Sequence, residues 1–319
     1  MQTFPRHFTG IKGLRPHLPR PRRRPSSAPA SSAWRSSDRS SARGAENRRL
    51  TGVDREPLNV ATLREQLAGS DLPLRRLDVV ETTGSTNADL LARHAAGEDI
   101  AGAVLLAEDQ SAGRGRNGRS WSAPPRSQIA LSIGVSAEGV PPAAWGWLPL
   151  LTGVALVDAI RETTGIEAGV KWPNDVLVGT GKLAGILAEV ASPDSVIVVG
   201  LGLNVTLTPE EAPDPRATSL QMLGASMLNR DVLAATILRN LTARVQRWQS
   251  KHGPDPALVE DYHRNSLTLG RLVRAILPGD HEIIGTATEV DHLGRLLIDT
   301  DTEVVTVSAG DITHLRAAD

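Results

Sequence analysis

The amino-acid sequence predicts an α+β fold: a mixed or antiparallel sheet with flanking helices, followed by a small C-terminal β-barrel. Four or five strand patterns follow one another between Val170 and Leu207 without an intervening helix. Two helical patterns come after them, and beyond Gly270 only short strands separated by turns remain. Runs of strands followed by runs of helices are typical of α+β domains, and a late stretch of short strands indicates a separate small β domain.

The first half of the folded region contains helices and strands in turn. Ser85 precedes a helical pattern and is a good N-cap, because its hydroxyl can accept a hydrogen bond from an N–H group of the first turn. The elements that the patterns predict here are helices at 58–67 and 85–94 and strands at 77–80, 103–107 and 129–135.

A long apolar segment, residues 140–157, contains 18 residues without a charge. This length approaches that of a membrane-spanning helix. Three prolines interrupt the segment, however, and Asp158, Arg161 and Glu162 continue the same helix with polar side chains. We therefore expect a buried core helix and not a membrane span.

The remaining patterns complete the predicted fold. Leu233, Ile237, Leu241 and Val245 recur at helical spacing within a helix expected at 231–248. The other expected elements are a helix at 256–263 and strands near residue 170 and at 176–178, 183–190, 196–199, 201–207 and 303–307. Together these elements predict three parts: a disordered tail at 1–56, an α+β domain at 57–266 and a small β domain at 267–319.

The composition separates the tail from the rest of the chain. Residues 1–50 hold 12 Lys and Arg residues against two acidic residues, and the remainder holds 23 against 34. The tail is rich in Arg, Pro and Ser and shows no apolar period, which predicts disorder. The chain has no cysteine, which excludes a disulfide framework, a thiol nucleophile and a Cys-ligated metal, and we expect the protein in the reducing cytoplasm.

The segment Gly113–Trp121, which we call the arginine loop, combines three glycines, three arginines and a tryptophan. Glycine lets backbone N–H groups approach an anion closely. The planar guanidinium groups of arginine match phosphate and carboxylate oxygens, and an indole ring offers a flat face to a base. This composition predicts a loop that closes over a nucleotide and its phosphates.

The spacing Gly-x-Gly-x-x-Gly in the arginine loop also occurs in dinucleotide-binding folds. Such folds require a strand before the motif, a helix that opens at its last glycine and an acidic residue about 20 positions further on. The strand at 103–107 is present, but the prolines within residues 122–127 prevent a helix. The nearest acidic residue downstream is Glu138, in a loop-like segment. This context excludes a dinucleotide-binding fold.

Lysine is rare in this chain: 31 residues are Arg and only four are Lys. Two of the four, Lys171 and Lys182, lie within the segments 171–175 and 181–189. Taken alone, each segment is compatible with an ordinary turn or hairpin, because Pro-Asn-Asp favours turns. A lysine at both positions nevertheless indicates that a compact ammonium, rather than a guanidinium, is needed there.

In chain order, five motifs together resemble the signature of the biotin protein ligases, the enzymes that attach biotin to the carrier domain of biotin-dependent carboxylases. The motifs are Ser85-Thr-Asn87, Glu108-x-Gln-x-Ala-Gly-Arg-Gly-Arg-x-Gly-Arg-x-Trp121, Lys171-Trp-Pro-Asn-Asp175, Gly181-Lys-Leu-Ala-Gly-Ile-Leu-x-Glu189 and Gly200-Leu-Gly-Leu-Asn-Val205. The resemblance extends over residues 77–319. It implies a class II synthetase-like biotin/lipoate ligase fold with an SH3-like C-terminal barrel.

The resemblance implies a reaction in which biotin and MgATP form biotinoyl-5′-AMP and pyrophosphate, after which a carrier lysine takes the acyl group. The implied catalytic residues are Lys171, whose ammonium would lie between carboxylate and α-phosphate, and Arg116. The implied biotin-binding residues are Ser85, Thr86, Asn87, Gln110, Gly113, Arg114, Gly115, Arg116 and Lys171. The implied ATP-binding residues are Arg116, Arg119, Trp121, Asn174, Asp175, Lys182 and Asn204. Asp175 is the residue expected to contact Mg²⁺, and Lys182 is expected to support its own loop.

Two other functions share part of this pattern. A lipoate or octanoate ligase has the same fold, but its glycine-rich signature differs from the arginine loop. A biotin-binding regulator of transcription needs about 60 patterned residues ahead of the ligase domain for a winged helix, whereas residues 1–56 are interrupted by prolines. We therefore expect a ligase without a structured DNA-binding domain, with a biotin carboxyl carrier protein domain as its partner and no association with a membrane.

Overall fold

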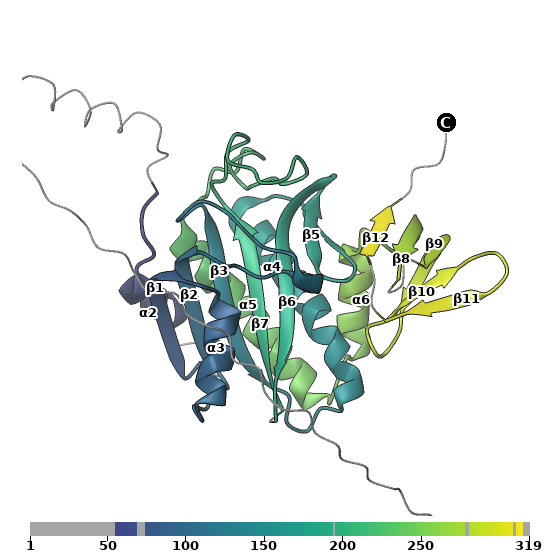
Figure 1. Ribbon diagram of the computed structural model, residues 1–319, viewed down its shortest axis with the longest axis horizontal. Coiled ribbons are helices and arrows are strands. Elements are labelled where there is room, and N and C mark those ends of the chain that lie inside the picture. Colours follow the sequence, from purple (N-terminus) through teal and green to yellow (C-terminus); the bar gives the residue numbers. More distant parts are fainter. Residues whose placement is uncertain (1–54, 69–73, 194, 278–280, 309–310, 315–319) are drawn as a thin grey trace, which may run out of the picture. The chain divides into compact units, whose positions relative to one another are not determined.

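The part of the chain that the computed structural model describes comprises residues 55–68, 74–193, 195–277, 281–308 and 311–314 (Figure 1). The predicted tail thus lies outside the described residues except for Arg55 and Glu56. Arg55 donates through Nη2 to the backbone oxygen of Thr206 at 2.9 Å, and the backbone oxygen of Glu56 accepts from Arg230 at 2.5 Å. Both residues therefore belong to the folded unit, which no local pattern could indicate because their partners lie far along the chain.

A seven-stranded mixed sheet forms the centre of the larger domain, with the strand order β1-β2-β3-β7-β6-β5-β4 (Figure 1). β1 and β2 are parallel, and all other neighbours are antiparallel. The strands are β1 (Arg76–Thr83), β2 (Ala103–Gln110), β3 (Gln128–Ser136), β4 (Gly169–Lys171), β5 (Asp175–Val178), β6 (Gly181–Ala191) and β7 (Val196–Asn204). The predicted mixed sheet is confirmed.

Helices cover both faces of this sheet (Figure 1). On one face, alternate strand residues such as Leu131, Ile186 and Leu203 enter the main hydrophobic core beneath α4 and α5. On the opposite face, Leu90 of α3 packs with Leu105 in a smaller apolar cluster. The helices are α2 (Val60–Leu67), α3 (Thr86–Ala95), α4 (Leu148–Thr164), α5 (Arg230–Ser250), α6 (Pro256–Asn265) and the short 3₁₀ helices η1 (Arg116–Gly118) and η2 (Pro142–Trp147).

The long apolar segment forms η2 and α4, as a helical stretch from Pro142 to Thr164. Among the described helices it is the one that is long and apolar enough to cross a membrane by length and composition. In the fold, 72% of its most apolar window is buried, and Leu151 and Val154 are fully enclosed in the core. The segment is therefore a core helix, as predicted.

Two strands expected at 196–199 and 201–207 are in fact the single strand β7. Gly200 and Gly202 do not interrupt its ladder, since they pair with Ser132 and Ala130 of β3. A Cβ at position 200 would lie 2.1 Å from a side-chain oxygen of Asn87. Glycine in this strand therefore marks a place where another segment lies directly on the backbone, and not a turn.

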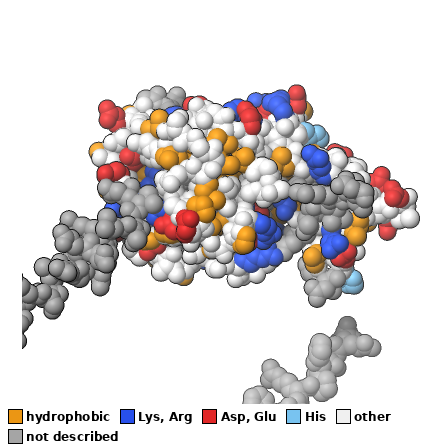
Figure 2. Space-filling model, turned by 90° about the horizontal axis from the view of Figure 1, so that it is seen from above, with side chains coloured by type: hydrophobic (Ala, Val, Ile, Leu, Met, Phe, Trp, Pro, Cys, Tyr) orange, Lys and Arg blue, Asp and Glu red, His pale blue; other side chains and the backbone are white. Residues whose placement is uncertain are grey.

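Charged side chains of both signs are scattered over the face drawn in Figure 2. Many arginines of the described residues pair with carboxylates, for example Arg76 with Glu98 at 2.9 Å and Arg126 with Glu81 at 2.6 Å. Pairing of this kind keeps basic charge local, so the arginines of this domain do not form one broad basic surface on the face shown.

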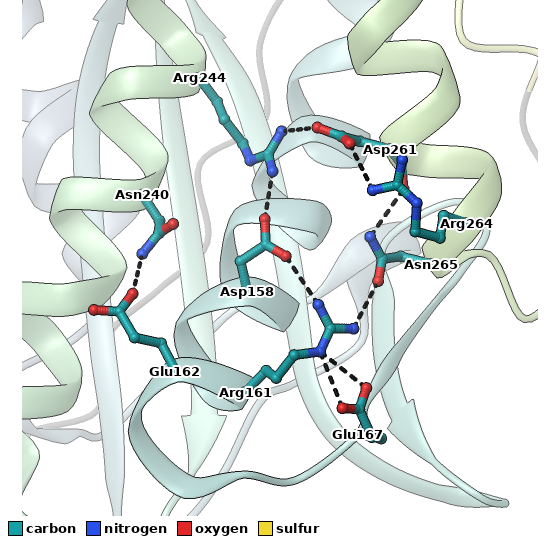
Figure 3. Close-up of polar contacts among 9 residues, drawn as sticks. All are labelled: Asp158, Arg161, Glu162, Glu167, Asn240, Arg244, Asp261, Arg264 and Asn265. Atoms are coloured by element: carbon teal, nitrogen blue, oxygen red, sulfur yellow. Dashed lines mark hydrogen bonds and ion pairs between the residues drawn. The ribbon is translucent and has the colours of Figure 1, made fainter.

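Polar contacts also join α4, α5 and α6 at their outer ends (Figure 3). Arg244 of α5 pairs with Asp158 of α4 and with Asp261 of α6, the latter at 2.8 Å. Arg161 of α4 donates to Asn265 of α6 at 3.1 Å. α4 is thereby held to α5 and α6, two consecutive helices that lie much later in the chain.

The small C-terminal domain is a five-stranded antiparallel sheet with the order β11-β10-β9-β8-β12. Two tryptophans of the larger domain contact it: Nε1 of Trp147 donates to the backbone oxygen of Asp291, and Nε1 of Trp172 to that of Gly294, each at 3.0 Å. Its strands are β8 (Leu272–Ile276), β9 (Glu282–Val290), β10 (Leu296–Asp299), β11 (Val304–Val307) and β12 (Asp311–His314). The predicted fold class, a mixed sheet with helices followed by small antiparallel β structure, is confirmed, and the predicted domain boundaries stay predictions.

Candidate functional site

The face of the main sheet that carries α3 has a floor made largely of glycine and alanine, which we call the glycine floor. Across the ladder, Asp175 pairs with Gly185, Gly185 with Gly202, and Gly202 with Ala130. Paired residues in neighbouring strands point to the same face, so this row presents two glycines and an alanine. The indole ring of Trp121 lies on it: a Cβ on Gly202 would fall 2.4 Å from the ring.

Both lysines singled out in the sequence are near this floor. Nζ of Lys182 lies 5.6 Å from the centre of a Trp121 ring and 2.7 Å from Oδ1 of Asp175. Lys171 pairs with Asp175 across β4 and β5, in the same row. The expectation that Lys182 only supports its loop therefore understates its position, because its ammonium stands beside the predicted adenine platform.

The arginine loop is a closed hairpin that returns to its starting strand. The backbone N–H of Trp121 donates to the oxygen of Gly113 at 2.9 Å, and that of Gly115 to the oxygen of Arg119 at 2.7 Å. Between them η1 makes a single turn, in which Arg116 donates through Nη1 to Oδ1 of Asn174 at 3.2 Å. The loop thus joins two predicted site segments, and the side chain of Arg119 at its tip is exposed.

The predicted biotin-binding residues at the start of α3 also come together. Oε1 of Gln110, at the end of β2, accepts from the backbone N–H of Thr86 at 2.9 Å and from its hydroxyl at 3.2 Å. Oγ of Ser132 in β3 and Oγ1 of Thr86 lie 2.6 Å apart. Ser85 is the N-cap of α3, and Asn87 is buried beside it. The N-cap interpretation of Ser85 is confirmed, and its role in a binding site stays a prediction.

A cavity of about 180 Å³ opens next to this assembly. Arg116 and Asn174 of the predicted set line it, together with residues of the turn 293–295 from the small domain. The cavity therefore brings a guanidinium and an amide to the junction between the main sheet and the β domain, where an elongated ligand on the glycine floor could extend.

Two predicted site residues have side chains that bond to other groups of the protein. The buried Asn204 donates through Nδ2 to the backbone oxygen of Thr218 at 2.9 Å, so it holds the segment after β7. Asp175, expected to contact Mg²⁺, is paired with Lys182. Among the described residues no group of three or more His, Asp or Glu side chains is arranged to hold a metal ion. The resemblance could not reveal either pairing, because a motif match does not show which groups a side chain contacts in the fold.

The segment after β7 is also fixed at the edge of the site. The backbone N–H of Lys182 donates to the oxygen of Arg216 at 2.6 Å, and Thr218 returns a bond to Lys182 at 2.9 Å. The hydrogen bond from the Arg216 side chain lowers the pKa of the Asp214 carboxyl to about 2. The two side chains form an exposed ion pair at the margin of the site.

Three side chains that sequence reasoning did not select belong to the same surface. Nε1 of Trp121 donates to Oε1 of Gln128 at 2.5 Å, Ser132 bonds to Thr86, and Glu189 contacts Arg114. A signal for two of them was present: Gln128 and Ser132, together with Ala130, alternate with apolar residues along β3. A period of two with small or polar residues on one face indicates a strand whose second face binds something other than the core.

The glycine floor leads to a testable expectation. Gly202→Ala places a methyl group against the Trp121 ring and should lift the ring off the floor, which we expect to weaken ATP binding by about tenfold. The measurement is the dissociation constant for MgATP. In a Trp121→Ala background the same substitution should have little further effect. An equal loss with and without the indole would show that the contact with Trp121 is not the cause.

Comparisons with known proteins agree in fold and in sequence. Residues 79–204 match the biotin/lipoate A/B protein ligase family, and residues 268–315 match the biotin protein ligase C-terminal domain. The biotin–[acetyl-CoA-carboxylase] ligase of Mycobacterium tuberculosis (strain ATCC 25618 / H37Rv) is 52% identical over 265 residues, which are 82% of this chain and 97% of that protein. The bifunctional ligase/repressor BirA of Escherichia coli (strain K12) is 34% identical over 267 residues, 82% of this chain and 79% of that protein.

Solved structures show the same architecture. The biotin protein ligase from Aquifex aeolicus in complex with biotin and ATP is similar with a TM-score of 0.66 at 25% identity, over 76% of this chain and all of that chain. The biotin protein ligase from Leishmania major in complex with biotinyl-5-AMP is similar in fold, with a TM-score of 0.51 at 24% identity, over 76% of this chain and 99% of that chain.

Proposed function

This chain belongs to the biotin/lipoate A/B protein ligase family, and on that premise we propose that it is a biotin–[acetyl-CoA-carboxylase] ligase. It activates biotin with ATP and transfers it to a lysine of the carrier domain of the carboxylase. One observation carries the proposal beyond the comparisons: the start of α3, the arginine loop and Lys182 meet on one face of the sheet, around a floor of glycine.

In the first step, a carboxylate oxygen of biotin attacks the α-phosphorus of ATP. The new oxygen–phosphorus bond forms as the bond from the α-phosphorus to the oxygen bridging to the β-phosphate breaks, and pyrophosphate leaves. Two anions must approach, so the site has to supply positive charge and alignment. Lys182 and Lys171, which flank Asp175, and Arg116, which reaches the cavity, supply that charge.

In the second step, the neutral amine of a carrier lysine attacks the acyl carbon of biotinoyl-AMP. A carbon–nitrogen bond forms, the carbon–oxygen bond to the phosphate breaks, AMP leaves with the electron pair, and the nitrogen loses a proton. Until the carrier arrives, water must be kept from the mixed anhydride. We assign this cover to the arginine loop, because its hairpin carries Trp121 onto the glycine floor.

We assign the binding residues to the two ends of the site. Hydroxyl and amide groups of Ser85, Thr86, Asn87 and Gln110 form a polar end that suits the ureido ring of biotin. Gly113 and Gly115 bring loop amides near the biotin chain, and Trp121 offers its ring to adenine. At the other end, Asn174 and Arg119 would face the phosphates, while Asn204 supports the nucleotide side indirectly through the segment that it holds.

Magnesium enters with its nucleotide. Mg²⁺ prefers phosphate and water oxygens and needs few protein ligands. Because the carboxylate of Asp175 faces an ammonium group, we assign the protein no ligand cage and treat MgATP as the substrate.

The absence of cysteine supports the cytoplasm as its location. From the sequence, residues 1–56 were not expected to form the structured DNA-binding domain of a regulator. Nearly all of these residues lie outside the described part of the chain.

The decisive experiment follows pyrophosphate release from MgATP with biotin, lipoate or octanoate as the acid. We expect release with biotin only, and then transfer of labelled biotin to a purified carrier domain. Release that depends on lipoate or octanoate and not on biotin would assign the enzyme to the other branch of the family. A failure to label the carrier despite adenylate formation would overturn the proposed partner.

Arg116 is expected to retain the intermediate. Its guanidinium lines the cavity and bonds to Asn174, so Arg116→Ala should speed the release of biotinoyl-AMP by about ten- to a hundredfold, the scale of a lost charge-assisted hydrogen bond or two. Release of labelled adenylate after gel filtration measures this rate. Arg126→Ala, outside the arginine loop, is the control and should leave the rate unchanged. Equal retention by the Arg116 variant and the wild type would contradict the assignment.

A further inference from the structure

Glu189 connects two segments of the site, the arginine loop and the start of α3. Its Oε1 lies 2.5 Å from Nη2 of Arg114, which is 75 residues away in the chain. Its Oε2 accepts from Nδ2 of Asn87 at 3.0 Å, 102 residues away. The side chain of Glu189 is 20% exposed and that of Arg114 is 44% exposed, so water screens this contact only in part.

The anchor on the α3 side is rigid. Asn87 is buried, and its Nδ2 also donates to the backbone oxygen of Leu187 at 3.1 Å. Its Oδ1 accepts from Ser132 at 2.6 Å and lies against Gly200. An amide held on both ends cannot rotate without losing several hydrogen bonds. Glu189 is therefore held by a fixed donor and presents its second oxygen to the loop in a fixed place.

The charges at this contact bear on the role of Arg114. The sequence resemblance implies that Arg114 binds biotin, and its guanidinium could in principle attract the substrate carboxylate. In contact with Glu189, however, it forms a nearly neutral pair, whose attraction for a third group is largely cancelled. Arg114 also pairs across the hairpin with Ser120, so that fixing Arg114 fixes both sides of the loop.

We propose that Glu189 is a positioning residue that fastens the arginine loop, through Arg114, to the buried Asn87. Arg114 is then the loop's half of a clasp and not a ligand of the substrate anion. The clasp holds the loop closed at the end of the site where the start of α3 lies, and its opening allows the bound intermediate to leave. The identity of that intermediate, biotinoyl-AMP, rests on the proposed function.

A double-mutant cycle tests the clasp. Glu189→Gln keeps an acceptor for Asn87 and removes the charge that faces Arg114, and Arg114→Gln removes the loop's partner. We expect each single variant, and also the double variant, to release biotinoyl-AMP about tenfold faster than the wild type, because a shared contact is lost only once. The adenylation rate at saturating biotin and MgATP should change less than the release rate. Arg114→Lys, which keeps the charge, should recover part of the retention.

A second readout does not need the reaction. In the ligand-free protein, amide hydrogen exchange at residues 113–121 should be faster in both single variants, with exchange in β6 and β7 unchanged. The matched control is Glu98→Gln, which removes a carboxylate from Arg76 at the opposite end of β1 and should alter neither readout. Thermal unfolding of the variants separates a general loss of stability from loosening of the loop.

The outcomes discriminate between the roles. If the two single effects multiply in the double variant, to about a hundredfold, Arg114 and Glu189 act independently and the clasp is overturned. Unchanged exchange in the loop would overturn it as well. A wild-type protein that releases no pyrophosphate with biotin would instead overturn the proposed function, and the exchange experiment would still decide whether the clasp exists.

Discussion

Lys182→Met is expected to lower the rate of biotinoyl-AMP formation by about a hundred- to a thousandfold, the scale of losing one preorganised electrostatic contact to the transition state. Methionine keeps the length and most of the volume of the side chain and removes the ammonium. The basis is geometric: Nζ of Lys182 stands 2.7 Å from Asp175 and 5.6 Å from the Trp121 ring centre, beside the residues that we propose bind the nucleotide.

A comparison with Lys171 makes this expectation sharper. Lys171→Met should also slow adenylation, since Lys171 lies in the same row of the sheet. We expect the smaller loss at Lys171, because Lys182 is the lysine placed beside the nucleotide platform. Single-turnover measurement of pyrophosphate release, with biotin and MgATP saturating, separates the chemical step from binding. If the Lys182→Met enzyme keeps most of this rate, Lys171 and not Lys182 is the main lysine of the adenylation step.

Glu108→Ala is expected to lower the free energy of unfolding by about 3–5 kcal/mol, because it leaves a buried guanidinium without its counter-charge. Glu108 lies in the arginine-loop motif, two residues before Gln110, yet its side chain points away from the predicted site. Its Oε2 accepts from Arg230 at 2.7 Å, and the two side chains are only 3% and 6% exposed. Its Oε1 accepts from the backbone N–H of Leu58.

Chemical denaturation with two independent probes measures this effect. Glu81→Ala is the matched control, since it breaks an exposed ion pair with Arg126, and we expect no measurable loss of stability. The double variant Glu108→Met with Arg230→Met should be less destabilised than Glu108→Ala, because no buried charge is left unpaired. If the free energy of unfolding of Glu108→Ala equals that of the control, the buried ion pair does not stabilise the fold as its burial indicates.

Several features of the fold and site could be read from the sequence because they depend on neighbouring residues. The N-cap at Ser85 and the helical period of α5 are local, and both are confirmed. The motif set indicated the ligase family, and that identification is confirmed. The roles of Lys171, Gln110 and the other site residues remain predictions, but the structure brings most of them to one face of the sheet.

Other features could not be read because they depend on contacts between distant segments. β7 was divided at its glycines, since nothing local showed that Asn87 and Trp121 lie on Gly200 and Gly202. Nothing local showed that the amide of Asn204 donates to the backbone of Thr218, and its place at the nucleotide stays a prediction. Glu108 stands in the same motif as the predicted site residues that follow it. Nothing in the motif indicated that Glu108 belongs to a buried ion pair and not to the site.

By itself, the sequence determined the fold class, the family and the set of residue types that acyl-adenylate chemistry needs. Alternating apolar residues, helix caps and motifs each involve residues that are close together in the chain, so they can be recognised from the sequence alone. Which distant charges meet became visible only in the folded chain: Glu108 and Arg230 are 122 residues apart in sequence, and Arg114 and Glu189 are 75 residues apart. The reason is physical, because such pairs form where sheet register and chain crossings bring segments together, and electrostatic attraction depends on distance in space and not along the chain.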